Sequence, residues 1–384
     1  MYNKALRRGR APLRFDLLVM KYFFVVFVFL VWFSSPASAQ QSAKLYETEV
    51  IVDSQDRGER ASAINSAFYR VLVKITGRPK AELMAHFSAK KLNPSQYLQQ
   101  FRYRDITPAE LNEHITSLNA QVLWVAFDSN SLNKLIFSEN IAFWGKVRPT
   151  ILVWLAVEDG SDRYLLTREN NFDITEALLA GGRERGLTLR LPVMDAEDRR
   201  NIQFADVWGD FGTTVLEASE RYQAGAVLSG RLYRTVTNAL AVKWTFYHPE
   251  GVERWQHHGD PIDRQLVYTS GVHHVADYLS EQFSEVLSEH AGTEVVLDVA
   301  AVHGVTDYAK VLEHLREFET VADVRIARLS GRTARYELQL RGTVEGLKKV
   351  IMLGEVLEEV KSDPIGFRIE DVSAASPLQY HLIQ

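Results

Sequence analysis

Apolar positions recur with clear periods in the first part of the chain. From residue 46 to residue 52, apolar and polar residues alternate, which predicts a half-buried strand. Between residues 61 and 75 the apolar residues follow spacings of three and four, as on one face of an amphipathic helix. Gly77 and Pro79 come directly after this stripe, and glycine and proline are typical of a helix end.

Two strongly apolar runs follow. Residues 121–128 (QVLWVAFD) and 150–157 (TILVWLAV) predict buried strands, because each is short and rich in branched and aromatic residues. Residues 132–140 predict a short helix between them.

The middle of the chain mixes both periods. Helices are predicted at 174–185 and 212–223, and strands at 187–191 and 226–233. Alternation from 240 to 247, a turn by composition at 248–251, and a returning strand at 252–257 predict a hairpin. A long apolar stripe from Tyr268 to Leu287 predicts a closing helix.

The last part predicts the order β-α-β-β-α-β, which is the ferredoxin-like split unit. Its clearest strand is residues 335–341, where apolar and polar residues alternate without exception. Thr306 and Thr343 are expected to cap its two helices. Its final strand is expected to run through Phe367 and Ile369.

The fold class predicted is therefore α+β, with mixed-sheet α/β domains followed by a C-terminal ferredoxin-like domain. The expected divisions are a signal peptide at 1–39, an N-terminal α+β domain at 40–158, a middle α/β domain at 159–291, a ferredoxin-like domain at 292–372 and a flexible tail at 373–384.

The N-terminus has the pattern of a secretory signal peptide. A basic region precedes the apolar run 22–33, and the small residues that follow predict cleavage between Ala39 and Gln40. The run is too short for a membrane span, which needs about 20 residues. Met20 with the apolar run already makes a complete signal, which favours a start at Met20 over Met1. The mature chain is expected to be a soluble periplasmic protein of a Gram-negative bacterium.

Composition narrows the function classes. The chain has no cysteine, which excludes disulfides, thiolate metal sites, a cysteine nucleophile and a lipidated cysteine. The formal net charge is −5, and without residues 1–39 it becomes −10, with 38 basic and 48 acidic residues. Such a chain is a poor nucleic-acid binder, because phosphate contacts need concentrated Lys and Arg. No second apolar run approaches the length of a membrane span.

Three stretches carry a family resemblance: residues 46–79, LWVAFD at 123–128, and FWGKVRPTILVWLAVED at 143–159. Their most specific pieces are Thr76-Gly77-Arg78, Trp144-Gly145 and Arg148-Pro149. In these stretches the chain resembles domain of unknown function 2066, a family of uncharacterised exported envelope proteins of proteobacteria. The resemblance implies an envelope protein and supplies no catalytic residue.

Two groups of residues are candidates for chemistry. The histidine groups His257-His258-Asp260 and His273-His274-Asp277 contain metal-ligand types, but no HExxH-like signature accompanies them. Five acids follow Pro192, and paired carboxylates serve glycan hydrolysis when they lie about 5 to 10 Å apart. These acids are Asp195, Glu197, Asp198, Asp206 and Asp210. For both groups the solvated surface is the favoured interpretation, so no catalytic residue, metal or cofactor is assigned.

Four residues are candidates for ligand binding or protein contact. Trp144 and Trp208 lie near glycines in connections, where an exposed ring is expected. Arg78 and Arg148 each adjoin a proline at a domain edge and can bind a carboxylate or phosphate. The favoured alternative for both arginines is that they fix a loop by donating to backbone carbonyls.

The leading hypothesis is a non-enzymatic binding or scaffold protein that supports assembly or maintenance of the envelope, with an envelope protein as its partner. A rival hypothesis is a hydrolase of cell-wall glycan or peptide. A third is a protein that binds a small ligand in a cleft between the first two domains.

Overall fold

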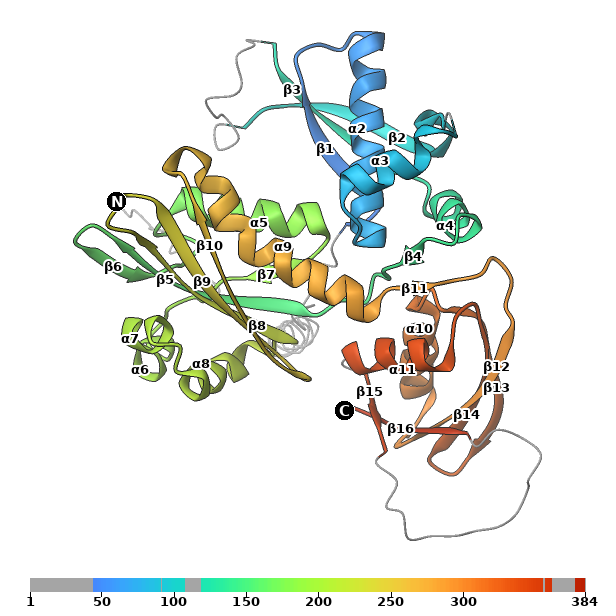
Figure 1. Cartoon of the computed structure of the whole chain (residues 1–384). Coiled ribbons are helices and arrows are strands. Elements are labelled where there is room, and N and C mark those ends of the chain that lie inside the picture. Colours follow the sequence, from blue (N-terminus) through green and yellow to red (C-terminus); the bar gives the residue numbers. More distant parts are fainter. Residues whose placement is uncertain (1–43, 91, 108–118, 355, 361–376, 384) are drawn as a thin grey trace, which may run out of the picture. The chain divides into compact units, whose positions relative to one another are not determined.

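The computed structural model describes residues 44–90, 92–107, 119–354, 356–360 and 377–383. Its first part contains β1 (Glu47–Val52), α2 (Arg57–Thr76), α3 (Lys80–Ser88), β2 (Leu98–Asp105), β3 (Gln121–Phe127), α4 (Ser129–Ser138) and β4 (Ala142–Phe143). The strands form an antiparallel sheet in the order β1-β3-β2, and α2 packs on it (Figure 1). The apolar stripe predicted for α2 is buried, and Gly77 ends the helix with a left-handed φ of 71°.

The middle part is a mixed sheet with helices on both faces. It contains β5 (Thr150–Asp159), β6 (Asp162–Leu165), α5 (Phe172–Arg185), β7 (Thr188–Arg190), α6 (Asp198–Asn201), α7 (Phe204–Trp208), α8 (Gly212–Ser219), β8 (Ala226–Arg234), β9 (Leu240–His248), β10 (Gly251–Gly259) and α9 (Arg264–Phe283). The strand order is β10-β9-β8-β5-β6, and β7 also pairs with β5. Helices α5 and α9 pack on one face, while α6, α7 and α8 lie on the other (Figure 1).

Sheet pairing corrects the first predicted boundary. β5 pairs with β6, β7 and β8, so it belongs to the middle sheet and not to a domain that ends at Glu158. The division falls before Thr150, because a central strand cannot be separated from the neighbours that satisfy its backbone. After α9, β11 (Glu285–Val286) pairs with β4, and Leu287 is buried in the core of the first part. Residues 285–287 thus return to the first part before the last one begins.

The last part contains β12 (Thr293–Ala300), α10 (Val305–Glu317), β13 (Val321–Ser330), β14 (Thr333–Leu340), α11 (Val344–Leu353), β15 (Leu357–Glu359) and β16 (Leu378–Leu382). The sheet order is β13-β14-β12-β16-β15. Without β16, this is the order of the ferredoxin-like split unit. The alternation predicted for residues 335–341 is confirmed as far as Leu340: Tyr336, Leu338 and Leu340 are buried, and Arg335 and Glu337 are exposed. The α+β fold class is confirmed as well.

The expected flexible tail at 373–384 is wrong for residues 378–382. These residues form β16, which runs parallel to β12 and antiparallel to β15. Tyr380 and Leu382 are buried there, which explains why the segment joins the sheet. Phe367 and Ile369 lie outside the described residues.

Only one of the two expected threonine caps is present. Thr343 accepts a hydrogen bond from the Gly346 amide at 3.0 Å. The cap of α10 is Gly304, so the expectation for Thr306 is wrong. None of the helices in the described ranges has both the length and the apolar character that crossing a membrane requires.

Candidate functional site

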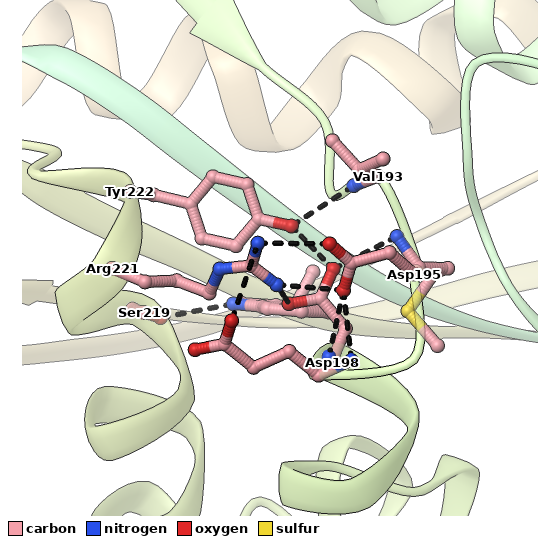
Figure 2. Close-up of polar contacts among 9 residues, drawn as sticks. Val193, Asp195, Asp198, Ser219, Arg221 and Tyr222 are labelled. Carbon is pink, nitrogen blue, oxygen red and sulfur yellow. Dashed lines mark hydrogen bonds and ion pairs between the residues drawn. The ribbon is translucent and has the colours of Figure 1, made fainter.

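The acidic connection after Pro192 is held together by one arginine. Arg221 donates from Nη1 and Nη2 to the two carboxylate oxygens of Asp195, at 2.7 and 2.9 Å, and from Nη1 to Asp198 at 2.8 Å. Asp198 is 1% exposed and also accepts from the Met194 amide and the Tyr222 hydroxyl. Figure 2 shows Arg221 beside the two carboxylates, with Tyr222 above it.

This arrangement gives the connection a structural role. Hydrogen bonding from Arg221, more than any other contact, holds the pKa of the Asp195 carboxyl well below its usual range. A general acid in glycan hydrolysis needs the opposite shift, a raised carboxyl pKa. Asp206 accepts from the Gln203 amide at 2.7 Å and caps α7.

In the described ranges, no group of three or more His, Asp or Glu residues is placed so that it could hold a metal ion, and this includes the two histidine groups. His257 and His258 are exposed on β10. On α9, His274 stacks on Trp255 with ring centroids 4.0 Å apart, and Asp277 pairs with Arg185 at 2.5 Å. These contacts tie α9 to β10 and α5.

Arg148 fixes the backbone around it. Its guanidinium lies 3.6 Å from the centroid of the Trp144 ring. Burial, above all other effects, lowers its pKa to about 9, which leaves it charged at pH 7. It donates to five carbonyls, those of Lys74, Trp144, Gly145, Arg185 and Gly186, at 2.6 to 3.1 Å. With its donors used in this way, Arg148 has the loop-fixing geometry that was the favoured alternative for it.

A binding site shared by Trp144 and Arg78 would need both side chains at the surface, and only Arg78 is partly exposed. Trp144 is 1% exposed, so the expectation of an exposed ring is wrong; Arg148 and the surrounding core cover it. Arg78 is partly exposed and pairs with Glu82 one turn along, at 2.8 Å. The structure therefore offers no ring at Trp144 for a ligand to stack on.

Trp208, the fourth candidate, lines a groove in the middle part. The groove has a volume of about 420 Å³, within the usual range for small-ligand sites. Its floor is the β8–β9 surface, and its walls are the end of α7 and strand β10. Its polar lining residues are Asp210, Ser229, Arg231, Lys243, Thr245, Arg254 and Gln256.

The groove exists because the helices on this face stop short of the sheet edge. α7 and α8 contact β5 or β8, whereas Arg254 and Gln256 on β10 remain exposed. The register places Thr245 opposite Arg254 and Lys243 opposite Gln256, so these four side chains share one face. Gly230 leaves room beneath this floor for the Trp244 ring, because a Cβ there would lie 2.4 Å from the ring.

Arg231, one of the cations in the groove, is held in place beside Trp208. Arg231 donates to the Trp208 carbonyl at 2.8 Å, and its guanidinium lies 5.9 Å from the centroid of the Trp208 ring. The Trp208 ring stacks on Phe204, with centroids 5.3 Å apart. Trp208 therefore acts as a wall that positions Arg231.

Directly after α7, Asp210 accepts from the Tyr247 hydroxyl at 2.7 Å and from Nε of Arg254, on the β10 wall, at 3.0 Å. Hydrogen bonds from Tyr247 and Arg254 outweigh burial, which acts against them, and lower the pKa of the Asp210 carboxyl. Asp210 is thus ionised and already engaged at neutral pH, and it holds Arg254 beside the floor.

Lys243 differs from these groups. It is half-buried on the groove floor, and it makes no hydrogen bond or ion pair within the part of the chain that the structure describes. With Arg231 and Arg254 it gives the groove three cations against one carboxylate, Asp210, counted over the residues that the structure describes. The groove is therefore a positive site on a chain whose net charge is negative.

Sequence reasoning found one wall of this groove, Trp208, and missed its charged residues. The alternation from 240 to 247 is the signal that puts Lys243 on one face of a strand with Thr245. Arg231 and Arg254 come from two further strands, and no spacing in the sequence shows that three strands bring them together.

Comparison with models of protein families gives a match in the first part of the chain. A family model described as a domain of unknown function (DUF8605) matches residues 39–145. An uncharacterised domain in this part is therefore supported, and it contains the stretch 46–79 that carries the family resemblance. The matching family differs from domain of unknown function 2066, whose membership stays a prediction. The search of curated proteins finds no match.

Proposed function

We propose that this chain is a non-enzymatic binding protein of the bacterial envelope, and that its groove holds an anionic group of the partner or ligand. The observation that carries the proposal is Lys243, a half-buried lysine on the groove floor whose ammonium has no partner in the described residues, beside two fixed guanidinium groups. A cluster of cations with an unengaged ammonium attracts an anionic group. A carboxylate or phosphoryl group would supply that partner.

The lining chemistry favours binding over catalysis. Among the described residues, the groove offers three cations and the hydroxyls of Ser229 and Thr245, and its one carboxylate there is engaged by Tyr247 and Arg254. A nucleophile activated by an adjacent base is the usual requirement for hydrolysis through a covalent intermediate. None of the lining residues is a histidine or a free carboxylate that could be such a base.

Export to the periplasm is the second element of the proposal. A basic region, a short apolar run and small residues precede Gln40, as in a cleaved signal peptide. The match to the uncharacterised domain begins at residue 39, next to the expected cleavage site, which supports this interpretation. Sequencing the N-terminus of the protein from a periplasmic extract tests it. A chain that keeps residues 22–33 in the membrane fraction contradicts it.

The binding element is tested by calorimetric titration of the mature chain with citrate and with pyrophosphate. We expect saturable binding, and at least about tenfold weaker binding in Lys243→Glu, since a charge-assisted hydrogen bond contributes about 1.5–3 kcal/mol. Lys80→Glu is the matched control. It makes the same charge change on an exposed residue of α3, so it should bind as the unmodified protein does. Equal loss in both variants, or no binding of either anion, overturns the proposal.

A further inference from the structure

Strand β10 borders the groove and forms an edge of the middle sheet. It runs for nine residues, Gly251–Gly259, and its only paired neighbour among the described residues is β9. Most of its side chains are exposed. An edge strand presents a row of backbone N–H and C=O groups that can pair with an added strand.

The hairpin fixes which of these groups point outward. The turn Pro249–Glu250 joins β9 to β10, and His248 pairs with Gly251. A two-residue hydrogen-bonded turn makes this closing pair a hydrogen-bonded one, and bonded and non-bonded pairs then alternate along the ladder. Residues 252, 254, 256 and 258 lie in the non-bonded pairs, so their amides and carbonyls point away from β9.

These same residues carry the side chains that face the groove. Arg254 lies opposite Thr245, and Gln256 lies opposite Lys243. In an antiparallel strand added to β10, the residues directly opposite 254 and 256 would have their side chains on the groove face. The outward backbone groups and the positive groove are thus parts of one surface.

We infer that β10 accepts an extended acidic segment of a partner protein as an added antiparallel strand. Acidic residues at every second position meet Arg254 and reach towards Lys243, and the backbone pairs with residues 252–258. This inference rests on the proposed function, because it names the source of the anionic group as a polypeptide carboxylate.

Charge decides the pattern of acids in the added segment and excludes strand β10 of a second copy as the occupant. The opposite face of β10 carries Glu253, which is exposed, so acids at consecutive positions of the segment would meet a like charge. Acids at alternate positions avoid it. A second copy of β10 would present Arg254 and no acid on the groove face, so its charge would repel the groove.

The test uses the mature chain and a labelled octapeptide of alternating Glu and Thr with blocked ends, followed by fluorescence anisotropy. In the expected geometry, the Glu residues lie on the groove face and donate their amides to β10. N-methylation of the Glu amides should therefore weaken binding at least about tenfold, because it removes the interstrand donors. N-methylation of the Thr amides, which point away from β10, should change binding less than about threefold.

A matched pair of protein variants tests the same contact from the other side. His258→Pro removes an outward N–H that β9 does not use, at an exposed residue that does not line the groove, and proline is tolerated at such positions of edge strands. It should weaken peptide binding at least about tenfold, whereas His258→Ala, which keeps the N–H, should have little effect. Circular dichroism establishes that both variants are folded, and citrate binding should persist in both.

The outcomes separate this inference from the proposed function. If citrate binds and Lys243→Glu weakens it, but the peptide binds equally well with either methylation pattern and to His258→Pro, strand addition is wrong and the groove alone is the site. If citrate binds and the peptide does not, the charges of β10 prevent it from pairing with an added strand, and the inference is also overturned. If neither binds, the proposed function fails first.

Discussion

Acidification should destabilise the last part of the chain through one buried histidine. His314 lies on α10, is 8% exposed, and its Nε2 atom has no hydrogen-bond partner in the described residues. Burial is the main cause that lowers its pKa from 6.5 to about 4, and Lys310, one turn earlier, adds to the effect. Glu317 is the nearest carboxylate, 3.8 Å from Nδ1. It does not offset the cost of burying the charge.

The direction follows from proton binding. Between pH 6.5 and 4 the unfolded chain carries the His314 proton and the folded chain does not. The stabilising effect of the neutral ring is thus complete above pH 6.5 and decreases as the pH falls towards 4. At pH 5 the loss is about 2 kcal/mol, and the full shift of the pKa corresponds to about 3 kcal/mol.

The assay is hydrogen exchange of peptides from residues 293–353, corrected for the pH dependence of intrinsic exchange, at pH 8 and pH 5. His314→Leu removes the titrating group. Between pH 8 and pH 5, the free energy of opening of this variant should therefore decrease by about 2 kcal/mol less than that of the unmodified protein. Carboxylates that titrate in both proteins contribute equally to the two decreases, so the difference between the decreases reports on His314. Equal decreases in the two proteins would refute the assignment of acid sensitivity to His314.

Three substitutions test the packing, each by urea unfolding. Arg148→Met should lower the free energy of unfolding by about 3 kcal/mol, because it leaves five carbonyls without their donor. The same change at the partly exposed Arg78 should lower it by less than about 0.5 kcal/mol. Leu338→Ala should lower the free energy of unfolding by about 2 to 5 kcal/mol and Gln339→Ala by far less, since only the leucine is in the core. Equal losses would mean that β14 is buried on both faces. Arg221→Met should lower the free energy of unfolding by about 2 kcal/mol because the buried carboxylate of Asp198 loses its cation. An unchanged midpoint of urea unfolding would show that water replaces the guanidinium.

The sequence by itself determined most of the local structure. The stripe of α2 and its end at Gly77 were readable because helix period and helix termination depend on neighbouring residues only. The alternation in β14 was readable for the same reason: one face of the strand is buried and the other is not. The α+β class followed from the order of such elements.

Tertiary structure alone decided the features that depend on residues far apart in the chain. β16 inserts between β12 and β15, and this pairing comes from segments about 80 and 20 residues away. Trp144 is buried because Arg148 covers it, although its glycine neighbour suggested exposure. The groove needs Trp208, Arg231, Lys243 and Arg254, which lie on one helix and three strands. Local patterns can show which face a residue takes, but only packing brings four such residues together and leaves Lys243 without a partner in the described part of the chain.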